Sequence, residues 1–386
     1  MQLEHKARLC SSLRRLVVKL GSSVVTTASG IDLDRIGRIT ASLSRLHERG
    51  YQIVVVTSGA RAAGLARLGM TSMPTTIPEQ QAAAAIGQIG LMSIYERFFS
   101  DYGRHIGQVL LTASDLENRT RYLNARRTIE HLLHHGLIPV VNENDSVAIE
   151  ELKFGDNDRL SALVAGLVDA DLLVMLTDVD GLFDGHPVNT AAKLIELVEN
   201  VDDTVLDCAG EAGEIGTGGM TSKLAAARSA AHRGIVSVIA NGCDDGILDR
   251  VLDPTRTAGT LVLASDSPIP NRKHWIAYGI QPRGSITVDA GAFMALASRG
   301  GSLLPSGVTG LEGDFEAGDC VSCIDPAGRE FARGLVAYDV RDCGRIKGLH
   351  SGTIEEVLGY NVGDEVIHRD DLVLLDQTEP DKGKRS

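Results

Sequence analysis

The chain has 386 residues, of which 43% are hydrophobic, and a formal net charge of −13 at pH 7. This length and apolar content can build two packed domains, and the acidic balance opposes a non-specific hold on nucleic acid. No apolar stretch is long enough to span a membrane, and the N-terminal segment lacks a signal-peptide core. We therefore expect a cytoplasmic protein that acts on small molecules.

The cysteines are too few and too dispersed for a disulfide framework in a chain of this length, which indicates a reducing compartment. They are Cys10, Cys208, Cys243, Cys320, Cys323 and Cys343. The spacing of Cys320 and Cys323 is that of a metal or redox pair. They lack a second close pair and lie in a run that alternates like a strand, so we expect core residues.

Up to about residue 265, short β-branched runs alternate with longer helical stretches, which predicts an α/β domain with a largely parallel sheet sandwiched by helices. Strands are predicted at 14–19, 52–57, 106–111, 137–141, 171–176, 235–240 and 260–264. Helices are predicted near 33–48, 79–101, 119–135, 157–168, 202–208 and 220–233. Helix-ending glycines precede three of the strands, at Gly50, Gly136 and Gly234.

The pattern changes near residue 280, where short alternating runs separated by Gly, Pro and Asp replace the long helices. Strands are predicted at 285–288, 318–324, 334–338 and 372–375. They indicate a smaller, mainly β domain, such as a small barrel with one or two short helices. We therefore predict domains over 1–270 and 280–376, and a disordered polar tail over 377–386.

The first chemical signal is Lys19, which lies in a predicted buried strand and is followed by Gly21, Ser22 and Ser23. Buried strands seldom carry an ammonium unless its charge is met. The turn would offer backbone N–H groups and hydroxyls at the carboxyl end of the strand, which suits a phosphate. A strand-edge lysine that reaches solvent would give the same pattern.

A glycine-rich loop at 213–219 runs into a helix that carries Lys223 in its first turn. Glycines allow the backbone to approach a phosphate, and a helix start adds N–H groups and a favourable dipole. The loop is neither a Walker A motif nor a dinucleotide fingerprint, because its glycines and lysine have other spacings. A flexible linker is the alternative.

Two further strands end in polar side chains, at Thr57-Ser58-Gly59 and at 142–146. A carboxylate such as Asp145 can pair with an ammonium, and amides can bind a carboxylate, so these turns suit a small zwitterion. Solvated loops would look similar.

The next polar segment precedes a predicted helix, where Asn157 or Asp158 would serve as the N-cap. The surplus carboxylate could align lysine ammonium groups or join a Mg²⁺ shell. Thr177 and Asp178 end a fourth strand in an Asp-x-Asp-Gly turn that lacks the spacing of an EF-hand.

Two lysines on phosphate-like loops indicate phosphoryl transfer from a nucleotide. A carboxylate acceptor would need no general base, because its pKa of about 4 leaves it ionised at neutral pH. Catalysis would then consist of positioning and of charge neutralisation by Lys19, Lys223 and Mg²⁺.

Taken in order, these motifs resemble those of the glutamate 5-kinase family, within the amino acid kinase superfamily. The resemblance continues into a C-terminal PUA domain and covers nearly the whole chain. Ser22 and the order Thr221-Ser222 depart from the usual family residues but keep the hydroxyl groups. The motifs are Val17-Val18-Lys19-Leu20-Gly21, Val56-Thr57-Ser58-Gly59, Val141-Asn142-Glu143-Asn144-Asp145, Gly155-Asp156-Asn157-Asp158, Thr177-Asp178 and Gly216–Lys223.

The resemblance implies ATP-dependent phosphorylation of the γ-carboxylate of L-glutamate, the first step of proline biosynthesis. By position, Lys19 and Lys223 would stabilise the transferring phosphoryl group, and Asp158 would hold both lysines. Glutamate would be bound by Ser58, Asp145 and Asn157. ATP would be bound by Lys19, Thr177, Asp178, Thr217, Gly218, Gly219, Met220, Thr221, Ser222 and Lys223.

The resemblance also implies ATP and Mg²⁺ as cofactors, with no side chain assigned to the metal. It further implies a homo-oligomer, feedback inhibition by proline and hand-over of the product to glutamyl phosphate reductase. The alternatives are a related kinase for N-acetylglutamate, aspartate, carbamate or UMP, and an RNA-binding PUA protein. Residues 281–375 carry eight Lys and Arg against fifteen Asp and Glu, which opposes RNA binding.

Overall fold

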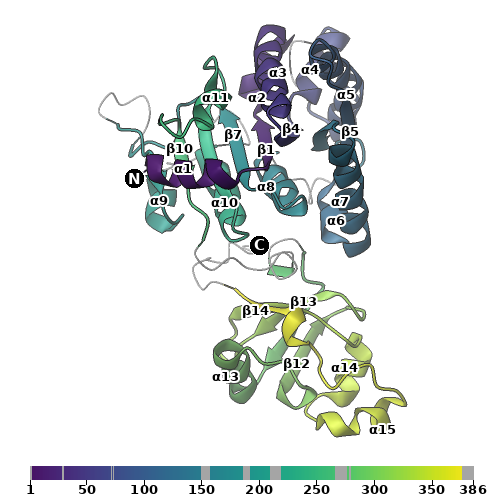
Figure 1. Cartoon of the computed structure of the whole chain (residues 1–386). Helices are drawn as coiled ribbons and strands as arrows, with labels where there is room; N and C mark the ends of the chain where they lie inside the picture. Colours follow the sequence, from purple (N-terminus) through teal and green to yellow (C-terminus); the bar gives the residue numbers. More distant parts are fainter. Residues whose placement is uncertain are drawn as a thin grey trace. The chain divides into compact units, whose positions relative to one another are not determined.

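The computed structural model describes residues 2–27, 30–70, 72, 74–148, 157–185, 192–208, 219–265, 276–277 and 280–375. The chain divides into two compact units, Met1–Pro268 and Ile269–Ser386 (Figure 1). In the described part of the chain, no helix is both long and apolar enough to cross a membrane. The predicted tail over 377–386 lies outside the described residues.

An eight-stranded sheet forms the centre of the first unit, in the order β5-β6-β4-β1-β7-β9-β10-β8. Its six strands from β5 to β9 are parallel, whereas β10 pairs antiparallel with β9 and parallel with β8. In this spatial order the strands are Ile106–Leu111, Ile138–Glu143, Gln52–Thr57, Arg15–Leu20, Leu172–Thr177, Val236–Asn241, Thr260–Val262 and Leu197–Val198. The predicted, largely parallel sheet is confirmed.

The helices of this unit cover both faces of the sheet. They are α1 Gln2–Ser12, α2 Ser22–Val25, α3 Leu33–Glu48, α4 Ala60–Leu68, α5 Ile77–Ser100, α6 Ala113–Glu117, α7 Arg119–His134, α8 Asn157–Leu167, α9 Asp203–Cys208, α10 Met220–Ala231 and α11 Ile247–Val251. A short hairpin pairs β2 Thr26–Thr27 with β3 Gly30–Ile31. All seven predicted strands begin within one residue of their observed starts, and the predicted helix 33–48 matches α3.

Strand β1 distributes its side chains between two cores. Leu16, Val18 and Leu20 pack in a core with α3 and α5, while Val17 packs in the opposite core with α7, α8 and α10. Because side chains alternate along a strand, Lys19 lies on the same face as Val17, toward α8 and α10.

The sequence prediction omitted five described helices of this unit: the short α2, α6 and α11, and the longer α1 and α4. Helix α1 is polar and is held by tertiary contacts: Lys6 Nζ donates to Arg250 O at 2.8 Å, and Gln2 Nε2 donates to Glu196 O at 2.9 Å. Helix α4 packs on α5 so closely that a Cβ on Gly64 would lie 1.7 Å from Ala83 O. Neither helix depends on an apolar period that could be recognised in the sequence.

The second unit contains a five-stranded sheet in the order β12-β11-β13-β14-β15. In this order its strands are Val308–Gly313, Gly284–Val288, Cys320–Ile324, Glu330–Leu335 and Leu372–Leu374. Among the described residues of this unit, the α-helices are α13 Ala290–Arg299, α14 Val340–Ile346 and α15 Ile354–Leu358. The mainly β character is confirmed, but the prediction missed β12, placed β14 about four residues too late and expected fewer helices.

The Cys320–Cys323 pair lies in strand β13, and both side chains are buried in the second unit. Burial raises the pKa of each thiol to about 12. Within the described ranges, no group of three or more His, Cys, Asp or Glu side chains could hold a metal ion. Both cysteines are therefore part of the buried core of the second unit.

Candidate active site

The predicted lysine, hydroxyl and amide side chains gather at the carboxyl edge of the parallel strands. Strand β1 lies between β4 and β7, with Lys19 beside Val56 and Met175 in register. Strands β4, β6 and β5 lie on one side of β1, and β7, β9, β10 and β8 lie on the other. The strand order therefore reverses at β1. Open α/β sheets bind ligands at such a point.

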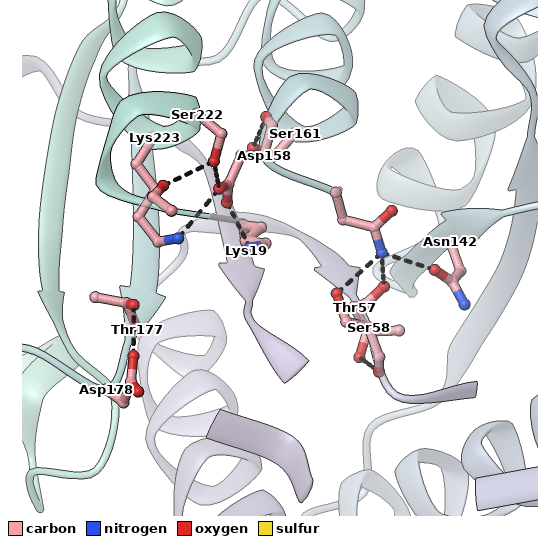
Figure 2. Close-up of polar contacts among 12 residues, drawn as sticks. Lys19, Thr57, Ser58, Asn142, Asp158, Ser161, Thr177, Asp178, Ser222 and Lys223 are labelled. Atoms are coloured by element: carbon pink, nitrogen blue, oxygen red, sulfur yellow. Dashed lines mark hydrogen bonds and ion pairs between the residues drawn. The ribbon is translucent and has the colours of Figure 1, made fainter. Parts of the chain in front are cut away.

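A buried cluster joins the two lysines that lie far apart in the sequence (Figure 2). Lys19 Nζ forms an ion pair with Asp158 Oδ1, and Lys223 Nζ lies 3.2 Å from Asp158 Oδ2. The side chains of Lys19, Asp158 and Lys223 are 4%, 0% and 5% exposed. Ser222 Oγ donates a hydrogen bond of 2.7 Å to Asp158 Oδ2. Three separate elements, β1, α8 and α10, thus meet at one carboxylate.

The electrostatics of this cluster favour an anionic ligand. Burial by itself would raise the pKa of Asp158, but the ammonium groups of Lys19 and Lys223 outweigh it and hold that pKa below its ordinary value. Asp158 is therefore ionised at neutral pH. Two ammonium groups facing one carboxylate leave a net positive charge in a buried place, which a phosphate would offset.

Gly21 keeps the turn after β1 close to the lysine. A Cβ on Gly21 would lie 3.2 Å from Leu176 O and 3.6 Å from Lys19 Nζ. A larger residue would therefore occupy space beside the ammonium. This turn can bring backbone and ligand near Lys19, as a phosphate site requires.

A second polar cluster lies beside the first, at the ends of β4 and β6 (Figure 2). Asn157 Nδ2 donates to Asn142 Oδ1 at 2.9 Å and to Ser58 Oγ at 3.1 Å, and it also donates to Thr57 O. The predicted pair Ser58 and Asn157 is therefore brought together. Asp145 is half-buried in the turn after β6.

Asn157 and Asp158 are the first two residues of α8, so the prediction that one of them is the N-cap is wrong. Consecutive helix residues point about 100° apart. Asn157 therefore contacts the ends of β4 and β6, while Asp158 contacts the two lysines. A single helix start positions both halves of the site.

The predicted nucleotide residues are only partly described. Thr177 is the last residue of β7 and Asp178 follows it, and Thr177 Oγ1 donates to Asp178 Oδ1 at 3.1 Å (Figure 2). Gly219 precedes α10, and the first turn of this helix contains Met220, Thr221, Ser222 and Lys223. Thr217 and Gly218 lie outside the described residues.

Two polar residues of α5, Gln88 and Tyr95, also belong to the site's surroundings, and the sequence prediction did not include them. Asn142 Nδ2 donates to Gln88 Oε1 at 2.8 Å, and Tyr95 OH lies 2.7 Å from Thr57 Oγ1. The sequence signal is their seven-residue spacing in a long apolar helix, which places both on one helix face.

The fold and the buried lysine pair define a phosphotransferase of the amino acid kinase type, and residues 14–241 match the amino acid kinase family. Residues 284–358 match the PUA domain. The "Glutamate 5-kinase" of Moorella thermoacetica is 49% identical over 96% of this chain and 99% of that protein. The "Glutamate 5-kinase" of Caldanaerobacter subterraneus is 47% identical over 95% of this chain and 99% of that protein. This chain belongs to the glutamate 5-kinase family.

One solved structure gives a weaker likeness. A crystal structure of UMP kinase from Bacillus anthracis is 16% identical, with a TM-score of 0.46, and the match covers 65% of this chain and 96% of that one. A likeness of this size has no bearing on the substrate.

Proposed function

We propose that this chain transfers the γ-phosphoryl group of ATP to the γ-carboxylate of L-glutamate, giving L-glutamyl 5-phosphate and ADP. The observation that carries the proposal is the buried cluster of Lys19, Asp158 and Lys223. Membership of the glutamate 5-kinase family supports glutamate as the acceptor.

In the proposed reaction, a γ-carboxylate oxygen of glutamate attacks the γ-phosphorus of ATP, and the bond from that phosphorus to the β,γ-bridging oxygen breaks. No base is required, because the acceptor is already ionised. Lys19 and Lys223 offset the negative charge on the transferring phosphoryl group and on ADP. Asp158 is a positioning residue that holds both ammonium groups without touching the reacting atoms.

We assign one substrate to each of the two clusters. Ser58, Asn157 and Asp145 would bind glutamate, with the Asp145 carboxylate available to its ammonium group. ATP would be bound by Thr177 and Asp178 at the carboxyl end of β7 and by the segment 217–223 at the start of α10. The adjacency of Asn157 and Asp158 supports this division, because it puts the acceptor beside the lysine pair.

Mg²⁺ is proposed to arrive with the phosphates of ATP. The described residues form no group of metal-binding side chains, and the Asp158 carboxylate is engaged by two ammonium groups. We therefore assign no side chain of the described residues to the metal. Mg²⁺ prefers to keep several waters and to bind nucleotide phosphates, which is consistent with this assignment.

The family membership further supports a kinase domain over residues 1–270 that binds ATP and glutamate, and a PUA domain over 280–376. A cytoplasmic homo-oligomer, inhibition by proline and product hand-over to glutamyl phosphate reductase complete the proposal. Proline carries the carboxylate and ammonium groups of an amino acid, so the groups that would bind glutamate could also bind proline.

A hydroxylamine trap tests the reaction. Hydroxylamine converts an acyl phosphate into a hydroxamate, so the purified protein should form hydroxamate only when ATP, Mg²⁺ and L-glutamate are all present. Added proline should reduce the rate. Turnover of N-acetylglutamate without turnover of glutamate would show that the chain has a different acceptor.

A further inference from the structure

Helix α5 carries three polar side chains at seven-residue spacing: Gln81, Gln88 and Tyr95. Seven residues are about two helical turns, so these side chains lie on one face of the helix. We call them the α5 polar seam. Its surroundings are apolar, since Leu91 and Phe99 of the same helix are fully buried in the core beneath the sheet.

Each residue of the α5 polar seam contacts a different segment at the edge of the site. Gln81 Nε2 donates to Ala148 O at 3.3 Å, in the segment after β6. Gln88 Oε1 accepts from Asn142 Nδ2 at 2.8 Å, at the end of β6. Tyr95 OH pairs with Thr57 Oγ1 at 2.7 Å, at the end of β4. The seam therefore spans the region proposed for glutamate.

Gln88 begins a chain of three amides. Its Oε1 accepts from Asn142 Nδ2, and Asn142 Oδ1 accepts from Asn157 Nδ2, which also donates to Ser58 Oγ. While Gln88 Oε1 accepts from the Asn142 nitrogen, the Asn142 oxygen is left to face Asn157, because an amide donates through nitrogen and accepts through oxygen. The donor direction of Asn157 is set by the Thr57 carbonyl, to which its Nδ2 also donates. Gln88 holds the Asn142 oxygen in place as a further acceptor for that nitrogen.

Burial makes this chain of amides sensitive to the loss of one member. Gln88, Asn142 and Asn157 are 9%, 3% and 8% exposed. Removing the Gln88 oxygen would leave the Asn142 amide with a buried, unpaired donor, which costs more than an exposed one. Asn142 could recover a partner only by turning, and its contact with Asn157 would then be lost.

The helix itself is held rigidly against α4, which starts just after Ser58. A Cβ on Gly87 would lie 1.8 Å from Ala60 O, and one on Gly64 would lie 1.7 Å from Ala83 O. Backbone therefore packs directly on backbone at two places. Such a contact permits little sliding, so the position of Gln88 relative to Ser58 is fixed.

We propose that Gln88 is a positioning residue for the acceptor, which acts through Asn142 to orient the Asn157 amide toward glutamate. The inference rests on the proposed function only for the identity of the acceptor. Gln88 has no assigned contact with ATP, so its effect is specific to the glutamate half of the site.

The test compares Gln88→Met with the wild-type full-length protein in the hydroxamate assay. Met has a similar length and suits a helix but cannot accept the Asn142 hydrogen bond. We expect the KM for glutamate to rise about tenfold, as for one buried hydrogen bond, with the KM for ATP within about twofold. In an Asn142→Ala background, Gln88→Met should change the KM for glutamate by less than about twofold.

Ser93→Ala, on the exposed face of the same helix, is the matched control and should leave both KM values unchanged. If Gln88→Met does not fold, judged by its melting curve, Gln88→Ala takes its place, because Ala also lacks the acceptor and favours a helix. An unchanged KM for glutamate, an equal rise in both KM values, or additive effects with Asn142→Ala would overturn the proposal.

A crystal structure of the Gln88 variant separates this inference from the proposed function. The Asn157 amide should lose its contact with Asn142 or with Ser58. If both contacts persist, the inference is wrong whatever the substrate is. If the wild-type protein makes no glutamate-dependent hydroxamate, the proposed function fails, and the amide contacts alone then decide the role of Gln88.

Discussion

Asp158 is the residue on which the charged part of the site depends. It is fully buried and binds two ammonium groups that come from different elements. Because two ammonium groups face this one carboxylate, removing either lysine leaves the carboxylate paired with the other one. Each lysine can therefore be replaced alone, and we expect the replacement to lower kcat more than it lowers the free energy of unfolding.

Lys19→Ala and Lys223→Ala are each expected to lower kcat by at least about a hundredfold, because each removes one charge from the transferring phosphoryl group. The melting curve should still show a cooperative transition. Lys193→Ala, which removes an exposed lysine of the same unit, is the control and should keep the wild-type kcat. A near-normal kcat of either variant would show that the replaced lysine takes no part in the proposed phosphoryl transfer.

At the scale of elements, the start of α8 and the pairing of α4 with α5 determine the geometry. The first two residues of α8, Asn157 and Asp158, each belong to one half of the site. Helix α5 contacts the ends of β4 and β6 through the side chains of Tyr95 and Gln88. The close approach of α4 and α5 is made possible by glycine, since no other residue fits where two backbones touch.

Gly87→Ala should therefore lower the free energy of unfolding by about 1–3 kcal/mol, because the helices must separate to admit a methyl group. Gly90→Ala on the same helix is the matched comparison. Its Cβ would lie 2.9 Å from Cζ of Arg67, the flexible end of a side chain that can move away. Chemical denaturation measures both variants, and equal effects would show that the backbone contact is not the cause.

At the scale of the whole molecule, the two units bury their cysteines differently. Cys320, Cys323 and Cys343 are fully buried in the second unit, whereas Cys10, Cys208 and Cys243 of the first unit are partly exposed. Burial raises the pKa of each of the three buried thiols to about 12. Reaction requires an accessible thiolate, so burial and protonation both protect these three thiols.

At pH 8, a thiol reagent such as iodoacetamide should leave Cys320, Cys323 and Cys343 unmodified in the native protein. A thiol pKa above the pH of the solution lowers the thiolate fraction. The raised pKa and the burial of these thiols therefore both slow their reaction with the reagent. In guanidinium chloride all six cysteines should react, as peptide mass analysis can establish. Rapid native modification of any of the three would contradict the packing of the second unit.

Much of the first unit could be predicted from local sequence because its signals are local. The apolar strand around Lys19, the helix over 33–48 and the cap glycines each depend on neighbours in the chain. The second unit was predicted less well, since the alternation around β14 continues past the point where pairing with β13 ends. Helix α1 could not be predicted, because Lys6 and Gln2 bind carbonyls far along the chain.

The sequence by itself determined the α/β class, the polar ends of the strands and the identity of the two lysines, because periodicity and turn chemistry are properties of adjacent residues. The family resemblance implied that Asp158 holds both lysines, but only the tertiary structure decided how the three side chains are buried together and that Gln88 contacts Asn142. Those contacts depend on how strands and helices from distant segments meet at one edge of the sheet, which no local pattern specifies.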